Sequence, residues 1–303
     1  MKKDFLSIAD CSTEEILEIF ELAKDLKQKQ KTGVEHHILK GKTLGLVFMK
    51  PSTRTRISFD VGMYHLGGHA LYLSPAEIGL GDRESVPDVA RVLSGFVDGI
   101  MARLFAHDDI VQLARWADVP VVNGLTDWLH PCQILGDMLT VIEHVGRYED
   151  VHVAYVGDGN NVCNSWLNLA AKLPFKFTVG APEGFDPDAE LLQAAQDAGK
   201  SEVKVVRSAQ EAVAGADIIY TDVWASMGQE EETESRKKIF SSFQVNDNLF
   251  SGTNADAKFM HCLPAHRGDE VTDEIMDGER SIVFDQAENR LHIQKAILVK
   301  LMA

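Results

Sequence analysis

The sequence predicts an α/β protein with two doubly wound domains, each with a parallel β-sheet flanked by helices. Short continuous apolar runs alternate with segments of helical periodicity along the whole chain. Continuous apolar strands are typical of parallel sheets that helices cover on both faces. The chain length, 303 residues, also suits two domains of about 150 residues.

The individual elements follow from apolar periodicity and from capping signals. Ser12 and Glu15 have the spacing of a capping box, and the apolar residues after them recur at helical intervals, so an amphipathic helix opens the chain. Strands are expected at Leu44–Met49, Ala70–Leu73, Gly99–Arg103, Pro120–Asn123, Val151–Val156, Phe177–Val179, Val203–Val206, Asp217–Val223, Lys258–Leu263 and Ile282–Asp285. Helices are expected between most of them, for example at Val86–Phe96, Ile110–Trp116, Gln133–His144 and Ala189–Ala198, and the last helix at Glu288–Leu301.

A domain boundary is expected near Gly146–Asp150. One helix ends at Gly146, and a charged stretch precedes a new strand. We therefore expect one domain over residues 1–146 and a second over residues 147–287. The final helix, residues 288–303, is expected to pack back on the first domain.

Composition and charge argue against several classes of protein. The net charge is −16 and no run of Lys or Arg stands out, whereas a nucleic-acid-binding protein needs a basic face. No apolar stretch approaches the roughly 18 residues of a membrane helix, and the N-terminus lacks the apolar segment of a signal peptide. The four cysteines are scattered and form no C-x-x-C pair, which indicates reduced thiols in the cytoplasm. We expect a cytoplasmic protein that binds neither nucleic acid nor membrane.

The strongest local signal is the segment Ser52-Thr53-Arg54-Thr55-Arg56, which lies between a buried strand and a helix. A helix N-terminus presents free backbone N–H groups and the positive end of the helix dipole. Hydroxyls and an arginine at that point favour a site for phosphate or another tetrahedral anion. The alternative interpretation is a helix cap with solvated arginines. The segment is not a Walker loop.

Further polar residues follow other predicted strands, at the edge where open α/β sheets bind ligands. His130 can polarise a carbonyl and Gln133 can hold an amide, although His130 can equally cap a helix. Asp222 can pair with an ammonium group or occupy a turn. Cys262 can be a nucleophile, a metal ligand or a small polar lining group. Arg290, near the start of the last helix, can assist an anion site.

Two cofactor interpretations are open, and each lacks part of its pattern. The pairs His130/Cys132 and His261/Cys262 suggest zinc, but their spacing matches no common zinc pattern. The segment Gly157–Asn161 resembles a dinucleotide fingerprint, but the third glycine of that motif is missing. We therefore expect no metal and no organic cofactor, and the same turn is free to serve a small ligand through Asn161.

Taken together, these segments resemble the aspartate/ornithine carbamoyltransferase family, and its ornithine-specific branch in particular. The motifs S-T-R-T-R, H-P-C-Q, D-x-x-x-S-M-G, H-C-L-P and E-N-R occur in the family's order and at similar spacings. The similarity covers essentially the whole chain. Each motif is modest alone, but together they are highly specific.

The resemblance implies roles for individual positions. The implied carbamoyl phosphate site consists of Ser52, Thr53, Arg54, Thr55, Arg103, His130, Gln133, Cys262, Leu263 and Arg290. The implied ornithine site consists of Asn161, Asp222, Ser226 and Met227. Arg103, His130 and Cys262 are the implied catalytic residues. The domain over residues 1–146 is implied to bind carbamoyl phosphate, and the domain over residues 147–287 to bind ornithine.

The activity that the resemblance implies is transfer of the carbamoyl group from carbamoyl phosphate to the side-chain amine of L-ornithine. The products are L-citrulline and phosphate, the context is arginine metabolism, and no cofactor takes part. Aspartate as acceptor would need cationic groups for its second carboxylate, whereas Asp222 suits an amine. Putrescine and acylated ornithine are closer alternatives, and a dinucleotide-dependent oxidoreductase built on Gly157–Asn161 is poorly supported.

The family also implies a homotrimer, or a multiple of trimers, whose neighbouring subunits share the loop before Glu84-Ser85. The chain departs from the family in this loop, because Gly79 stands where many members carry Gln or His. The shared contact is then expected to be weaker, or to come from another residue such as Arg83.

Overall fold

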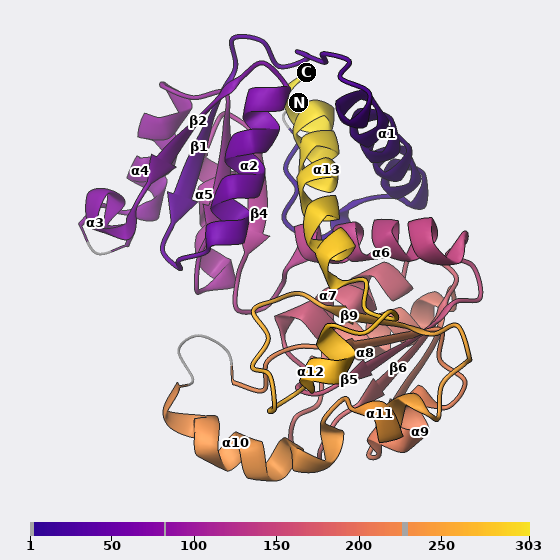
Figure 1. Cartoon of the computed structure of the whole chain (residues 1–303). Helices are drawn as coiled ribbons and strands as arrows, with labels where there is room; N and C mark the ends of the chain where they lie inside the picture. Colours follow the sequence, from indigo (N-terminus) through magenta and orange to yellow (C-terminus); the bar gives the residue numbers. More distant parts are fainter. Residues whose placement is uncertain (1–2, 82, 226–229) are drawn as a thin grey trace. The chain divides into compact units, whose positions relative to one another are not determined.

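The structure is a computed structural model that describes residues 3–81, 83–225 and 230–303, and it divides into two compact units. The first unit contains the chain up to Gly136 together with Asn289–Ala303, and the second contains Asp137–Glu288. Helices α6 (Pro131–Val145) and α13 (Val283–Met302) each run from one unit into the other (Figure 1). The sequence predicts boundaries after residues 146 and 287, at the ends of elements, whereas both divisions in the structure fall inside helices.

The first unit is built on a four-stranded parallel sheet in the order β2-β1-β3-β4. Its strands are β1 (Thr43–Phe48), β2 (His69–Leu73), β3 (Gly99–Arg103) and β4 (Val121–Leu125). Its complete helices are α1 (Thr13–Lys31), α2 (Thr53–His65), α3 (Pro75–Ile78), α4 (Val86–Ser94) and α5 (His107–Trp116), after a 3-10 turn at Ile8–Asp10. Apolar side chains from β1, β3, α4 and α5 pack together as its core.

The capping box predicted for the first helix is confirmed. Ser12 Oγ accepts a hydrogen bond from Glu15 N at 3.2 Å, and the Glu15 carboxylate accepts one from Ser12 N at 2.9 Å. The side chains that α1 buries include the whole of the predicted apolar stripe, Ile16, Ile19, Phe20, Ala23 and Leu26. Capping therefore fixes where α1 begins, and burial of the stripe fixes which face it turns inward.

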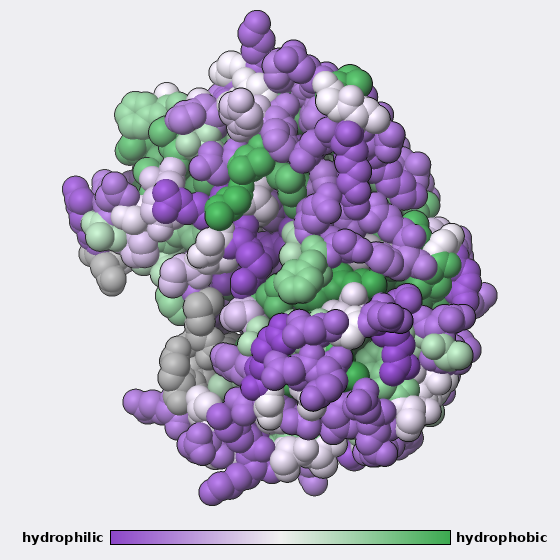
Figure 2. Space-filling model, viewed as in Figure 1, coloured by the Kyte–Doolittle hydropathy of each residue, from purple (hydrophilic) through white to green (hydrophobic). Residues whose placement is uncertain are grey.

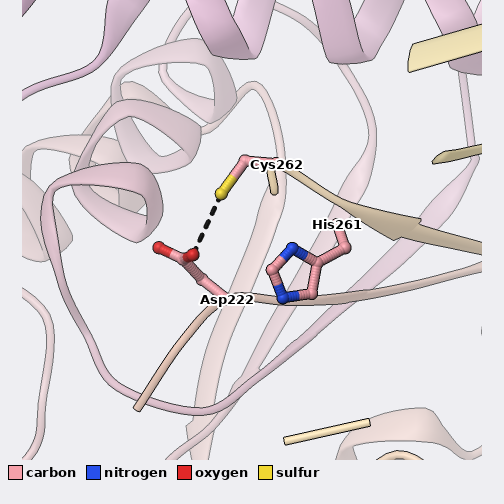
Figure 3. A group of neighbouring side chains, drawn as sticks. All are labelled: Asp222, His261 and Cys262. Atoms are coloured by element: carbon pink, nitrogen blue, oxygen red, sulfur yellow. Dashed lines mark hydrogen bonds between the residues drawn. The ribbon is translucent and has the colours of Figure 1, made fainter. Parts of the chain in front are cut away.

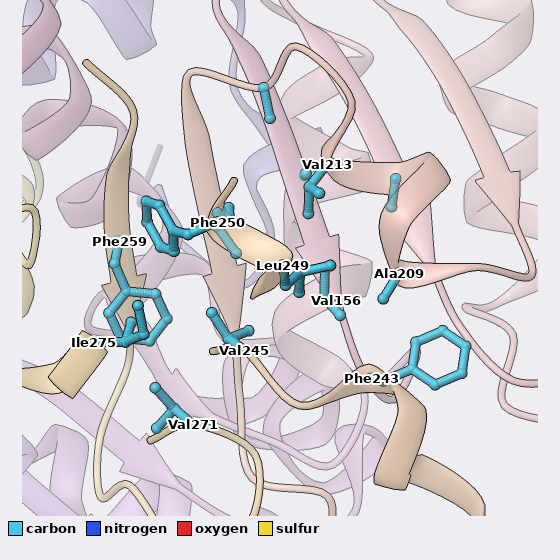
Figure 4. Close-up of a cluster of buried hydrophobic side chains, with 14 of the residues drawn as sticks. Val156, Ala209, Val213, Phe243, Val245, Leu249, Phe250, Phe259, Val271 and Ile275 are labelled. Carbon is cyan, nitrogen blue, oxygen red and sulfur yellow. The ribbon is translucent and has the colours of Figure 1, made fainter. Parts of the chain in front are cut away.

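The second unit is built on a five-stranded parallel sheet in the order β7-β6-β5-β8-β9. Its strands are β5 (His152–Val156), β6 (Lys176–Gly180), β7 (Glu202–Val206), β8 (Ile218–Thr221) and β9 (Lys258–His261). Its helices are α7 (Asn161–Ala170), α8 (Ala189–Ala198), α9 (Ala209–Val213), α10 (Thr233–Phe240), α11 (Asp247–Phe250) and α12 (Asp273–Met276), with 3-10 turns at Glu230–Glu232 and Ser241–Phe243. A buried apolar cluster packs between this sheet and α9 to α12 (Figure 4).

The predicted fold class is confirmed, and one predicted element is wrong. Ile282–Asp285 is not a strand, because α13 begins at Val283 and only Ser281 forms an isolated bridge, to Phe259. The last helix therefore starts five residues before the predicted Glu288. A run of four apolar and polar residues is too short for periodicity to separate a strand from the first turn of a helix.

No helix in the described part of the chain is long and apolar enough to cross a membrane. Hydrophilic residues cover most of the face shown in Figure 2. This surface agrees with the net charge of −16.

Candidate functional site

Several of the predicted site residues follow the strands between which the order of each sheet reverses. In the first sheet the order reverses between β1 and β3, and Ser52 follows β1 while Arg103 ends β3. In the second sheet it reverses between β5 and β8, which Asn161 and Asp222 follow. Open α/β sheets bind ligands in the crevice beyond the carboxyl ends of such strands. Topology therefore selects these positions in both units.

In the first unit, the N-terminus of α2 carries the predicted anion-binding segment. Ser52 is the N-cap residue, and its Oγ accepts from Thr55 N at 3.2 Å. Arg290 Nη2 donates to the buried Thr55 hydroxyl at 2.8 Å. The first turn of α2 contains no acidic residue. Hydroxyls, free N–H groups and a guanidinium thus meet where the helix dipole favours an anion.

Arg54 has an unused donor at this site. Its Nε atom is buried and has no hydrogen-bond partner among the residues that the structure describes. A buried N–H without an acceptor is costly in free energy. A bound anion at the α2 N-terminus would supply the missing acceptor.

Arg103 lies beside the same segment, together with Lys50, a cation that the sequence did not identify as a site residue. Arg103 is buried, and its Nε donates to the carbonyl of Lys50 at 3.2 Å. Lys50 is also buried, forms an ion pair of 2.8 Å with Asp127, and lies 4.9 Å from the centre of the Phe105 ring. Its signal in the sequence is a basic residue between the buried strand and Ser52.

His130 is buried just before the first turn of α6, and the buried Gln133 follows in that turn. Burial lowers the pKa of His130 well below its ordinary value, and nearby positive charges lower it further. In order of effect, those charges belong to Arg290, Arg103, Arg54 and Lys50. His130 is therefore neutral and surrounded by cations, which makes this part of the first unit a strongly positive site.

In the second unit, Asp222 follows β8 as a buried carboxylate. Its Oδ1 accepts from Val223 N at 2.8 Å and from Cys262 Sγ at 2.9 Å (Figure 3). Its Oδ2 accepts from Asn160 Nδ2 at 2.8 Å. All three donors are neutral, and no described residue forms an ion pair with Asp222. A buried negative charge without a cation is a site for a cationic ligand group.

The turn Gly157–Asn160 does not match a dinucleotide site. A Cβ atom at Gly159 would lie 2.2 Å from Pro187 N and 2.4 Å from the carbonyl carbon of Asp186. The glycine is therefore needed for close approach of the chain's own backbone, at the place where a dinucleotide motif admits a pyrophosphate. Asn160 caps α7, and the predicted ligand residue Asn161 is the first residue of that helix.

His261 and Cys262 lie with Asp222 in one group, whose possible metal-ligand atoms are within 4.8 Å of one another. The imidazole of His261 is already engaged, because Nδ1 accepts from Leu263 N at 2.8 Å and Nε2 lies 3.2 Å from Glu270 Oε1. Cys262 donates its thiol hydrogen to Asp222. These contacts hold the H-C-L-P segment together and use the atoms that a metal would need.

A groove of about 430 Å³ opens at the opposite, amino-terminal edge of the second sheet. Two of its acids are occupied by neighbours: Glu202 pairs with Lys204, and Asp217 accepts from His152 N and from Asn254 Nδ2. The groove contains none of the predicted site residues.

The predicted residues fall into two sets, one in each unit. The resemblance assigns Cys262 and Leu263 to carbamoyl phosphate, but both belong to the second unit, where Cys262 contacts Asp222. The other residues of that set belong to the first unit. Ser226 and Met227 lie outside the described residues. Sequence reasoning missed Lys50 and Asn160, although an Asn just before a helix is a standard capping signal.

Gly79 is constrained by the turn in which it lies. It ends α3 with a left-handed backbone (φ 50°), and a Cβ atom there would lie 2.6 Å from Cβ of Arg83. Arg83 itself donates to the carbonyl of Glu77 at 3.2 Å. The local turn therefore favours glycine over the Gln or His of the family pattern.

The fold and the two residue sets define a two-domain α/β protein with a candidate anion site in one unit and, among the described residues, a carboxylate without an ion-pair partner in the other. Residues 3–143 match the family profile described as "Aspartate/ornithine carbamoyltransferase, carbamoyl-P binding domain". Residues 149–301 match the profile of the "Asp/Orn binding domain" of the same family. The chain belongs to the aspartate/ornithine carbamoyltransferase family.

Similar proteins point to one branch of this family. The chain is 54% identical over 298 residues to an ornithine carbamoyltransferase of Syntrophus aciditrophicus, covering 98% of this chain and 99% of that protein. It is 52% identical over 301 residues to the chloroplastic ornithine carbamoyltransferase of Pisum sativum, covering 99% of this chain and 80% of that protein. The solved structure of the Pyrococcus furiosus ornithine carbamoyltransferase superimposes with a TM-score of 0.96 at 51% identity, covering 99% of this chain and 97% of that one.

Proposed function

We propose that this chain transfers the carbamoyl group of carbamoyl phosphate to the side-chain amine of L-ornithine, giving L-citrulline and phosphate. The observation that carries the choice of acceptor is Asp222, a buried carboxylate whose three hydrogen-bond donors are neutral. Such a group attracts the α-ammonium of ornithine. The matches to proteins called ornithine carbamoyltransferase support the same acceptor.

Carbamoyl phosphate is proposed to bind in the first unit. Its phosphate is assigned to the α2 N-terminus, where the unused Arg54 Nε meets a run of hydroxyls. Its carbamoyl group is assigned to Arg103, His130 and Gln133. The residues assigned to it in this unit are Ser52, Thr53, Arg54, Thr55, Arg103, His130, Gln133 and Arg290, and the family resemblance adds Cys262 and Leu263. Lys50 adds positive charge to the same site.

The acceptor end of the reaction is proposed to use Asn161, Asp222, Ser226 and Met227. Asp222 pairs with the α-ammonium, and Asn161, the first residue of α7, holds the α-carboxylate. Putrescine lacks this carboxylate, and an acylated ornithine lacks the free α-ammonium. Both are therefore expected to be poor acceptors.

The chemical step follows from the charges of these groups. The neutral side-chain amine attacks the carbamoyl carbon, the carbonyl oxygen becomes an oxyanion, and the carbon–oxygen bond to phosphate then breaks. Arg103 and the N–H of neutral His130 are assigned to stabilise the oxyanion, which is usually the largest catalytic term. The leaving group is already activated, so the reaction needs neither metal nor organic cofactor. The amine proton passes to a phosphate oxygen or to solvent.

Assembly and location complete the proposal. We propose a homotrimer, or a multiple of trimers, in the cytoplasm. The exposed apolar side chains of α2 and of the edge strand β2 support a subunit interface, among them Ile57, Tyr64 and Leu71. The four cysteines carry no disulfide, which supports a reducing compartment.

The test measures citrulline-type product formation by wild type and Asp222→Asn with four acceptors in parallel: ornithine, aspartate, putrescine and N-acetylornithine. Wild type is expected to use ornithine far better than the others. Asp222→Asn should raise the ornithine KM about tenfold or more and leave the carbamoyl phosphate KM unchanged, because one charge-assisted contact to the acceptor is lost. Asp247→Asn, an exposed aspartate in the first turn of α11, is the matched control. Equal weakening of both substrates would assign Asp222 a structural role.

A further inference from the structure

Asn160 joins the N-terminus of α7 to the carboxylate of Asp222. Its Oδ1 accepts from Val162 N at 2.9 Å and from Cys163 N at 3.3 Å, which caps the helix. Its Nδ2 donates to Asp222 Oδ2 at 2.8 Å. One side chain therefore contacts both the helix that follows β5 and the acid that follows β8.

The orientation of this amide is fixed by its own contacts. Oδ1 also accepts from the hydroxyl of Tyr155 at 3.1 Å, so it has three donors around it. Burial raises the pKa of Tyr155 well above its ordinary value, which keeps that hydroxyl protonated and donating. A flipped amide would place its NH2 group against three donors and its oxygen against a carboxylate. Only the observed orientation satisfies all four contacts.

We propose that Asn160 is a positioning residue for the acceptor, because its amide holds Asp222 Oδ2 and thereby aims the carboxylate at the α-ammonium of ornithine. This inference rests on the proposed function. Cys262 and Val223 hold only Oδ1. Without the Asn160 amide, Oδ2 has no donor among the described residues, and the carboxylate can rotate about its Cβ–Cγ bond. Asn160 acts through Asp222 and forms no part of the reacting atoms.

The competing interpretation is that Asn160 only caps α7, and Asn160→Asp separates the two. An ionised aspartate caps a helix at least as well as asparagine and adds a favourable charge at its N-terminus. If Asn160 only caps α7, the activity of Asn160→Asp relative to wild type should therefore not fall as pH rises. If Asn160 positions Asp222, the relative activity of Asn160→Asp should be highest at low pH. The introduced carboxyl, when protonated, would donate to Asp222 as the amide does. When it is ionised, the two carboxylates repel each other at this distance. Such a pair shares one proton, and one of its pKa values is strongly raised.

The other ionisable groups around this pair do not imitate that behaviour. They are Tyr155, Asp158, Cys163, Tyr220, Cys262, Arg236 and His261, whose ring lies within 4.8 Å of the Asp222 carboxylate. Burial raises the pKa of Tyr155, Tyr220 and Cys163. Asp158 is paired with Arg236 at 2.8 Å. Each of these groups is also present in wild type, so a variant-to-wild-type ratio at each pH removes their contribution.

The experiment measures kcat/KM for ornithine from about pH 6 to about pH 9 in wild type, Asn160→Asp and Asn160→Ser. The Asn160→Asp to wild-type ratio is expected to fall about tenfold or more as pH rises, through KM more than through kcat. Asn160→Ser keeps a capping oxygen and loses the reach to Asp222, so its KM should be raised at every pH. Asn246→Asp, which changes the cap of α11 in the same way, is the control and should give a flat ratio. Circular dichroism checks that each variant is folded.

A second readout avoids catalysis. L-norvaline keeps the α-amino acid end of ornithine and lacks the reacting amine, so its dissociation constant, measured with phosphate present, should follow the same pH pattern. A flat or rising ratio for Asn160→Asp, or a normal KM for Asn160→Ser, overturns the positioning role. Absence of citrulline from the wild-type reaction would instead contradict the proposed function, so the two failures are distinct.

Discussion

Among single residues, those of the proposed anion site in the first unit carry positive charge and a donor that the described protein leaves without an acceptor. Arg54 has a buried Nε without a partner in the described chain. His130 is kept neutral by burial and by four surrounding cations. A dianionic donor would bring the missing negative charge. Binding and catalysis should therefore be far more sensitive to Arg54 than folding is.

Arg54→Ala is expected to lower kcat/KM for carbamoyl phosphate roughly 30- to 1,000-fold, because a charge-assisted contact to a dianion is lost. This factor corresponds to about 2–4 kcal/mol of transition-state stabilisation. The unfolding free energy should change little, since a buried donor without a partner is removed. Arg91→Ala is the charge-matched control, because Arg91 is an exposed residue of α4. Steady-state kinetics and urea unfolding measure the two effects. A folded Arg54→Ala enzyme with nearly wild-type kcat/KM would contradict the anion site.

Residue-level prediction from the sequence worked where a motif has a strong local cause. The hydroxyl and arginine cluster after β1 could be predicted because a helix N-terminus binds anions in any fold. Asn160 could not be assigned its contact with Asp222, because 62 residues separate them and only the order of β5 and β8 brings them together. Lys50 was missed for a related reason: its importance depends on burial, and lysine is usually exposed.

At the scale of elements, α13 is held to α1 by a buried lysine. Lys295 Nζ donates to Leu26 O at 3.3 Å and to Gln30 Oε1 at 2.9 Å, and it lies 3.4 Å from His36 Nε2. Leu26 O and Gln30 Oε1 are uncharged acceptors, and burial lowers the pKa of Lys295 from 10.5 to about 8. The folded state therefore releases this proton at lower pH than the unfolded state.

The pH dependence of stability follows from that shift. Between about pH 8 and the ordinary lysine pKa, the unfolded chain binds the proton more tightly, so the Lys295 contribution to the unfolding free energy rises with pH, by at most about 1.4 kcal/mol per pH unit. Lys295→Met should remove this rise. Urea unfolding of both proteins at about pH 7.5 and 9.5 measures the difference. An identical change with pH in the two proteins would contradict a depressed Lys295 pKa.

Element boundaries show what periodicity can and cannot predict. The predicted strand at Gly99–Arg103 and the predicted helix at Ala189–Ala198 agree with the structure at both ends. The strands predicted to reach Val223 and Leu263 end at Thr221 and His261 instead. Asp222 and Cys262 therefore lie just beyond the ends of β8 and β9, although the apolar pattern extends past them. Their side chains contact each other there. An apolar pattern does not predict these strand ends, because it carries no information about side-chain hydrogen bonds.

At the scale of the whole molecule, assembly is expected to cover an apolar surface of the first unit. In the described part of the chain, strand β2 is an edge strand that pairs with β1, and its Leu71 is 42% exposed. On α2, Ile57 is 54% exposed and Tyr64 is 75% exposed. Exposed apolar side chains beside an open sheet edge are typical of subunit interfaces.

Light scattering is expected to give wild type a mass of three chains or a multiple of three. The double variant Tyr64→Glu/Leu71→Arg should give a smaller mass while circular dichroism stays unchanged, because a buried charge would be left unpaired in the interface. If neighbours share the loop before Glu84, the dissociated protein should also lose activity, although Gly79 offers only backbone atoms. A monomeric wild type, or a dissociated variant with full activity, would contradict this part of the account.

Carbamoyl transfer to ornithine can be followed through the carbamoyl carbon itself. Purified wild-type protein is incubated with carbonyl-¹³C carbamoyl phosphate and L-ornithine, with and without a chelator, and the products are identified by mass spectrometry and ¹³C NMR. We expect the label to appear on the side-chain nitrogen of ornithine, as L-citrulline, in step with phosphate release and at the same rate when metals are removed. Label that stays in carbamoyl phosphate, passes to another acceptor in preference to ornithine, or moves only when metal is restored would contradict it.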